Sequence, residues 1–119
     1  MMTVLFKSIL IVEDEMLIAM DAEDSLETAG HGVAKIARTV SEAMRALQDN
    51  QVDAALLDFN LPDGTSAPIA RWLQEHGVPF AIVTSQSPNQ LSGEGLPHSR
   101  IYQKPSDYAA IAQELAEAA

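Results

Sequence analysis

"LLDFNLPDG", residues 56–64, places a carboxylate at the end of a segment that otherwise has the composition of a buried strand. The run "DAALLDF" (53–59) is nearly continuous in apolar residues, which is typical of a parallel strand covered on both faces. A Pro-Asp-Gly turn follows shortly after Asp58. Burying a lone carboxylate is costly unless another group pairs with it. Asp58 therefore has either a structural partner or a chemical role.

The rest of the chain alternates apolar runs with amphipathic stretches. The apolar runs predict five strands, at residues 8–12, 32–38, 53–59, 79–85 and 100–104. Helical periodicity between them predicts helices. The first is expected to end at Gly30, and the second to begin near Ser41 as its cap. The third is expected to begin near Ser66 and Pro68 and to end at Gly77, and the last to be capped by Ser106 or Asp107. We therefore expect an α/β fold: an open five-stranded parallel sheet, doubly wound, with the flavodoxin-like strand order 2-1-3-4-5.

One connection breaks this pattern. Residues 85–99 lie where a fourth helix belongs, but they contain two Pro, two Gly and four Ser. Leu91 and Leu96 are the large apolar residues of the segment. Gly and Pro are the least favourable residues in a helix interior. We expect a weak or irregular fourth helix that is more mobile than the others.

Composition limits the class of protein. The 119 residues predict one domain, residues 1–119, and the absence of cysteine excludes disulfides, thiolate metal sites and cysteine nucleophiles. The sequence shows neither a secretory signal nor an apolar run of roughly 20 residues that could span a membrane. The simplest expectation is a soluble cytoplasmic protein without membrane contact.

The net charge of −10, from 17 acidic and 7 basic residues, argues against direct binding of nucleic acid. The basic residues are scattered, and we assign the acidity mainly to solubility. His31, His76 and His98 have no metal-ligand spacing, and we expect all of them at the surface.

Functional groups follow the predicted strands at the places where strands end. In an open parallel sheet, the site lies beyond the carboxyl ends of the strands. Glu13 and Asp14 follow the first strand, and Asp58 ends the third. Thr84 ends the fourth strand, and Lys104 ends the fifth. Because these ends meet at one edge of the sheet, we expect the groups to converge.

Three close carboxylates either hold protons at raised pKa values or bind a cation. Oxygen ligands suit a hard divalent ion, so Glu13, Asp14 and Asp58 predict a site for Mg²⁺ (or Mn²⁺), which the backbone carbonyl of Asn60 can join. With the Lys104 ammonium and the Thr84 hydroxyl, this makes a cage suited to phosphoryl transfer. The Asp58 carboxylate would then be a nucleophile that forms an acyl phosphate. Each residue alone has an ordinary explanation, such as acids favoured at a helix N-terminus; their combination carries the prediction.

These residues also lie in recognisable motifs: "ILIVEDE", "ALLDFNLPDG", "VTS" and "KP". Together they resemble the receiver domain of bacterial two-component response regulators, over essentially the whole chain. The resemblance implies that Asp58 is the phosphoacceptor, that Asp14 binds Mg²⁺ directly and that Glu13 acts on it mainly through water. Asn60 would coordinate through its backbone, while Thr84 and Lys104 would contact the phosphoryl group.

The resemblance also implies partners. The phosphodonor would be a sensor histidine kinase or a phosphotransfer protein, and the domain would catalyse its own phosphorylation and dephosphorylation without being a turnover enzyme. If residues 1–119 are the whole protein, we expect either output through an unidentified protein partner, with the 85–104 face switching the contact, or a role as a phosphate relay or sink.

A narrower match is to the FATGUY branch of receivers, through "LDFNL", the Ser-x-Pro helix start and Phe-Ala in the fourth strand. The chain departs from this branch at Ser85, where a Gly is usual. It departs from receivers in general at Ile101, where an aromatic switch residue is usual. Tyr102 follows one position later and should point to the opposite face of the sheet.

Two other functions fit the same fold. A flavin-binding domain would need a hydroxyl- and glycine-rich phosphate loop after the first strand, where "EDEM" instead offers carboxylates. A receiver-like interaction module that takes no phosphate would have no reason to hold three repelling carboxylates beside a lysine. Both remain alternatives to phosphoryl acceptance.

Overall fold

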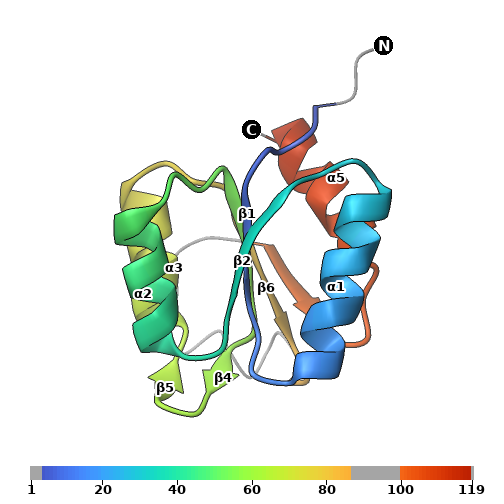
Figure 1. Cartoon of the computed structure of the whole chain (residues 1–119). Coiled ribbons are helices and arrows are strands. Elements are labelled where there is room, and N and C mark those ends of the chain that lie inside the picture. Colours follow the sequence, from blue (N-terminus) through green and yellow to red (C-terminus); the bar gives the residue numbers. More distant parts are fainter. Residues whose placement is uncertain (1–3, 87–99, 119) are drawn as a thin grey trace.

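The computed structural model describes residues 4–86 and 100–118, which form an α/β domain (Figure 1). The helices are α1 (Met16–Thr28), α2 (Val40–Asp49), α3 (Ala67–Glu75) and α5 (Tyr108–Ala118). The strands are β1 (Ile9–Val12), β2 (Val33–Ala37), β3 (Ala54–Leu57), β4 (Asn60–Leu61), β5 (Gly64–Thr65), β6 (Phe80–Thr84) and β7 (Arg100–Gln103).

The main sheet is parallel and has the strand order β2-β1-β3-β6-β7. Counted along the chain, and without the two short strands β4 and β5, this is the predicted order 2-1-3-4-5, so the predicted fold is confirmed. The last residues of β1 and β3, Val12 and Leu57, are direct partners, and Thr84 of β6 pairs with Gln103 of β7. The strands therefore end together, at the edge where the predicted functional residues follow them.

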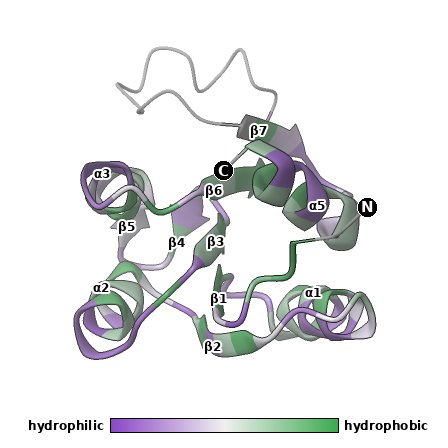
Figure 2. Ribbon diagram, turned by 90° about the horizontal axis from the view of Figure 1, so that it is seen from above, coloured by the Kyte–Doolittle hydropathy of each residue, from purple (hydrophilic) through white to green (hydrophobic). Residues whose placement is uncertain are grey.

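Helices cover both faces of the sheet. Figure 2 shows α1 and α5 on one face and α2 and α3 on the other. Alternate strand residues point to opposite faces: Leu10 and Val12 join the core beneath α2 and α3, whereas Ile9 and Ile11 join the core beneath α1 and α5. Burial on both faces explains why the central strands are apolar without alternation.

The helix caps differ in part from the prediction. The cap of α2 is Thr39, whose Oγ1 accepts the Glu42 N–H at 3.0 Å, so the prediction of Ser41 was wrong. Thr39 has the extended backbone that a capping residue needs, so the helix begins at Val40 and Ser41 already lies in its first turn. At α5, Asp107 accepts the Ala110 N–H at 3.1 Å, as one of the two predicted alternatives.

The prediction for His31 was also wrong, because its side chain is buried and only 4% exposed. Its Nδ1 accepts the Phe6 N–H at 3.0 Å, and its ring stacks on that of Phe6. Burial lowers the pKa of His31. The segment before β1 covers this ring, a contact between distant parts of the chain. His76 is exposed, as predicted, and stacks on Trp72.

A short antiparallel hairpin, β4–β5, follows Asp58 directly and was not predicted. The weak fourth helix, and His98 with it, falls within residues 87–99, outside the described residues, so both stay predictions. Within residues 4–86 and 100–118, no helix has the length and apolar character needed to cross a membrane.

Candidate phosphorylation and metal site

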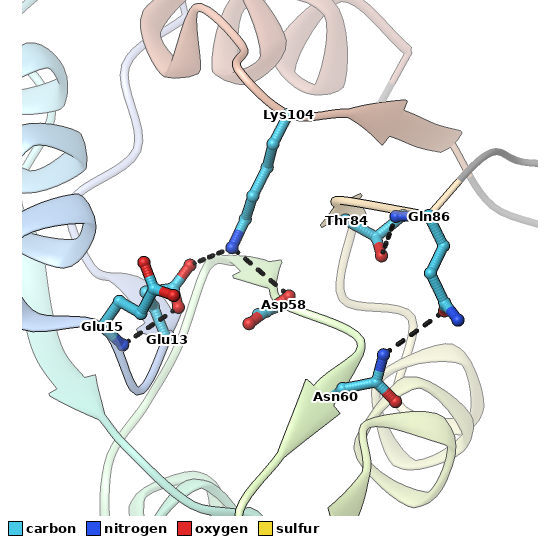
Figure 3. Close-up of polar contacts among 7 residues, drawn as sticks. All are labelled: Glu13, Glu15, Asp58, Asn60, Thr84, Gln86 and Lys104. Carbon is cyan, nitrogen blue, oxygen red and sulfur yellow. Dashed lines mark hydrogen bonds and ion pairs between the residues drawn. The ribbon is translucent and has the colours of Figure 1, made fainter.

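The carboxyl edge of the sheet brings Glu13, Asp58 and Lys104 together (Figure 3). The Lys104 ammonium lies 2.6 Å from Glu13 Oε1 and 3.4 Å from Asp58 Oδ1. Glu13 is only 4% exposed. The partner that the partly buried Asp58 carboxylate requires is therefore Lys104, supplied from a strand end on the far side of β6.

The sheet itself sets these positions. The Glu13 N–H donates to the Ala37 carbonyl at 2.9 Å, and the Asp58 N–H donates to the Val12 carbonyl at 2.8 Å. The Lys104 N–H donates to the Thr84 carbonyl at 2.7 Å. Each functional residue is thus held by a backbone bond to the neighbouring strand, at the first position beyond or near its own strand end.

Three carboxylates form one cluster. Glu13, Asp14 and Asp58 each offer an oxygen, and these oxygens lie within 4.8 Å of one another. Burial, followed by repulsion from Glu13, raises the pKa of Asp58 to about 6 in spite of Lys104. Burial alone would lower the pKa of Lys104, but its hydrogen bond to Glu13 and the charge of Asp58 outweigh this and raise it. The cluster carries negative charge that one lysine does not neutralise.

The donor set fits a hard divalent cation. Carboxylate oxygens are ligands that Mg²⁺ and Mn²⁺ accept, and a cation at the cluster would relieve the repulsion that raises the pKa of Asp58. Both oxygens of Glu13 are already engaged, Oε1 by Lys104 and Oε2 by the Glu15 N–H at 3.1 Å. Asp14 is half-buried and offers its carboxylate from the same loop.

Thr84 and Asn60 lie on the side of Asp58 opposite to Glu13 (Figure 3). Thr84 is 1% exposed, and its Oγ1 accepts the Gln86 N–H at 3.2 Å. The Asn60 amide donates to Gln86 Oε1 at 3.3 Å. Gln86 was not among the predicted site residues, although its place two residues after Thr84, at the same strand end, could have indicated it.

Tyr108 of α5 is a second neighbour of the site that was not among the predicted site residues. It is buried and lines one small cavity together with Glu13 and Asp58. Burial raises the pKa of its hydroxyl. The signal that could have found it is its position in the first turn of the helix that follows Lys104.

The two residues around the expected aromatic position behave as predicted. Ile101 packs against the core beneath α2 and α3, and Tyr102 against the core beneath α1 and α5. The Tyr102 hydroxyl donates to the Glu114 carboxylate of α5. The two side chains therefore point to opposite faces.

A doubly wound parallel sheet with an acidic cluster and a lysine at its carboxyl edge defines the receiver class of α/β domains. The family model of the response regulator receiver domain matches residues 9–115, and the chain belongs to this family. It is thus a receiver domain of two-component signalling systems.

Several named relatives match the chain over most of its length. The chain is 34% identical over 113 residues to the phyllosphere-induced regulator PhyR of Methylorubrum extorquens, covering 92% of this chain and 42% of that protein. It is 35% identical to SdrG of Sphingomonas melonis, with a TM-score of 0.76, covering 95% of this chain and 94% of that one. A mutant form of PhyR from Bartonella quintana, described as an anti-anti-sigma factor, is 31% identical, with a TM-score of 0.77 and coverage of 93% and 49%. The chain spans less than half the length of the curated relatives it matches.

Proposed function

We propose that residues 1–119 act as one cytoplasmic domain that accepts a phosphoryl group on Asp58 from a sensor histidine kinase or a phosphotransfer protein. The observation that carries the proposal is the contact of Asp58 with Lys104, at 3.4 Å, within a cluster of three carboxylates. A receiver-like binding module would be destabilised by this cluster and would gain nothing from it. A flavin site would place phosphate against the same negative charge.

The chemistry is a displacement at phosphorus. An oxygen of Asp58 attacks the phosphoryl group while the bond from phosphorus to the donor breaks, the bond being to imidazole nitrogen in a phosphohistidine. The departing imidazole takes a proton from solvent, and Asp58 becomes an acyl phosphate. A bound Mg²⁺ supplies charge neutralisation for the phosphoryl oxygens. The protein would thereby catalyse its own phosphorylation and dephosphorylation without turning over an external substrate.

The roles of the other residues follow from their positions. Asp14 would hold Mg²⁺ directly, together with Asp58 and the Asn60 backbone carbonyl. Glu13 would act through water, which agrees with the engagement of both its oxygens. Lys104 and the Thr84 hydroxyl would contact the phosphoryl group, as the proximity of Lys104 to Asp58 supports.

The test is phosphoryl incorporation from acetyl phosphate, with and without Mg²⁺. We expect one phosphoryl group per chain in the presence of Mg²⁺ and none after chelation, and the product should be cleaved by hydroxylamine, as acyl phosphates are. A protein that stays unlabelled in Mg²⁺ by acetyl phosphate and by a panel of histidine kinases would instead be a receiver-like interaction module.

Mg²⁺ should stabilise the protein by mass action. A ligand that binds only the folded state contributes about 2.7 kcal/mol at a hundredfold excess over its dissociation constant. We expect millimolar Mg²⁺ to raise the melting temperature by several degrees and to raise that of Asp14→Ala much less. Differential scanning calorimetry of both proteins measures this. A parent protein whose melting temperature is the same with and without Mg²⁺ would contradict the proposed metal site.

The surface beside the site is suited to a protein donor. A groove of about 440 Å³ runs from Lys104 to α1 and is lined by Leu17, Asp21 and Tyr108, among others. Leu17 is 83% exposed, and Met16 and Met20 are also exposed. We propose that the donor's histidine-bearing helix docks here, because the groove is continuous with Lys104.

Replacing Leu17 should therefore separate the two kinds of donor. Leu17→Asp is expected to slow transfer from a histidine kinase that phosphorylates the parent by about tenfold or more, as for a central interface residue. Labelling by acetyl phosphate, which needs no docking, should be unchanged. Val4→Asp, an equal change at an exposed residue before β1, is the control. Equal kinase rates for the parent and Leu17→Asp would exclude this surface.

The signal is proposed to leave the domain through a protein contact. We propose the 85–104 face as the switched surface, and the description of the PhyR of Bartonella quintana as an anti-anti-sigma factor supports a protein target. The net charge of −10 argues against direct binding of nucleic acid by this domain.

A further inference from the structure

The hairpin that follows Asp58 is tied to a helix by a single side chain. Asp63 lies in the turn of the β4–β5 hairpin. Its Oδ1 accepts the Val40 N–H at 2.8 Å, and its Oδ2 accepts the Ser41 N–H at 3.1 Å. These amides open α2, where N–H groups have no partner within the helix. One carboxylate therefore joins the phosphoacceptor loop to the start of α2.

The start of α2 has a second, local cap. Thr39 accepts the Glu42 N–H, and the Glu42 carboxylate accepts the Arg38 N–H at 2.6 Å. The hydrogen bond from Val40 chiefly holds the pKa of Asp63 below its usual range, so the bonds to Asp63 are charge-assisted. Thr39 and Asp63 both accept backbone N–H groups at the start of α2, but of these two residues only Asp63 belongs to the hairpin.

The same helix start also contacts the other acidic loop. Arg38 Nη2 donates to the Asp14 carbonyl at 3.4 Å. The loops after β1 and after β3, which carry the carboxylate cluster, are thus both hydrogen-bonded to residues at the start of α2. Asn60 lies between Asp58 and the hairpin turn, so its backbone position depends on where the turn is fixed. At its other end the hairpin is closed by the Ser66 N–H, which donates to the Phe59 carbonyl at 2.8 Å.

We propose that Asp63 is a positioning residue of the metal site: it ties the hairpin to α2 and thereby holds the Asn60 carbonyl where a cation at Glu13, Asp14 and Asp58 can use it. This inference rests on the proposed function, since it assumes that the cluster binds Mg²⁺. Groups that orient metal ligands contribute to affinity because they remove the freedom that binding would otherwise have to remove.

The experiment is a calorimetric Mg²⁺ titration of the whole chain, with melting temperatures measured in parallel. Asp63→Ala is expected to weaken Mg²⁺ binding by about threefold or more, below the roughly 10–100-fold typical of direct partners of metal ligands, because Asp63 acts through the chain. Thr39→Ala is the matched control. It removes a cap from the same helix without freeing the hairpin, so it should lower the melting temperature comparably and leave Mg²⁺ affinity unchanged.

Loss of charge is separated from loss of the tie by Asp63→Asn. Asparagine keeps one acceptor oxygen and should recover part of the affinity that alanine loses. A purely electrostatic effect would make the two variants equal and would largely vanish at about 0.5 M salt, where exposed charges are screened. That result, or parent-like Mg²⁺ affinity in Asp63→Ala, overturns the inference. Failure of the parent itself to bind Mg²⁺ would refute the proposed metal site instead, so the two failures are distinguishable.

Discussion

Asp58→Asn is expected to abolish phosphoryl incorporation from both acetyl phosphate and a histidine kinase. The amide keeps the shape of the side chain but removes the nucleophilic carboxylate oxygen. Lys104 retains its 2.6 Å contact with Glu13, so the surrounding structure loses only the weaker of its two ion pairs. Labelling should therefore fall to background in a protein that is still folded.

The same variant should be more stable than the parent when metal is absent. Burial and the neighbouring Glu13 raise the pKa of Asp58 to about 6, so the ionised form is disfavoured in the fold relative to the unfolded chain. A raised carboxyl pKa costs stability progressively as the pH rises from about 4 to about 6 and fully above that, here on the order of 3 kcal/mol at neutral pH. Asparagine removes this cost, and we expect its melting temperature in chelator to rise by several degrees.

Asp24→Asn supplies the control for this variant. Asp24 is exposed on α1, so its replacement removes one negative charge without touching the cluster. Its labelling and melting temperature should match those of the parent. Undiminished labelling of Asp58→Asn would remove the phosphoacceptor assignment, whereas lower metal-free stability would contradict the repulsion described for the cluster.

The parts of the site that could be predicted from the sequence are the residues positioned by the ends of strands. Parallel strands bring their carboxyl ends to one edge, so Glu13, Asp58 and Lys104 could be placed together from their positions after apolar runs. The contacts at 2.6 and 3.4 Å agree with that placement. Alternation along a strand likewise predicted that Ile101 and Tyr102 face opposite ways.

The parts that could not be predicted depend on side chains that reach across the fold. Asp63 lies 23 residues from Val40, and His31 lies 25 residues from Phe6, so no local pattern links either pair. The cap of α2 shows a related limit. Thr39 and Ser41 both have capping side chains, and only the backbone conformation, extended at Thr39, decides between them.

Gly32→Ala is expected to cause the largest loss of stability among these variants. A Cβ at Gly32 would lie 2.2 Å from the Lys7 carbonyl oxygen, which is backbone and cannot move aside as a side chain could. Gly32 also donates to the Phe6 carbonyl and accepts from the Ile9 N–H, both at 2.9 Å. Relieving the clash means separating the segment before β1 from the start of β2, and with it these bonds.

The comparison with Gly77→Ala isolates the close approach from backbone preference. Gly77 has a φ of +69° but open space around its Cβ position, so alanine there should cost only about 1–2 kcal/mol. Gly32 needs no left-handed conformation, yet we expect its replacement to cost about 3 kcal/mol or more and to lower the melting temperature by roughly 10 °C. Thermal unfolding of the two variants decides the matter. If Gly32→Ala melted at the same temperature as Gly77→Ala or at a higher one, the close contact between Lys7 and Gly32 would not be needed to hold β1, the strand that Glu13 and Asp14 follow.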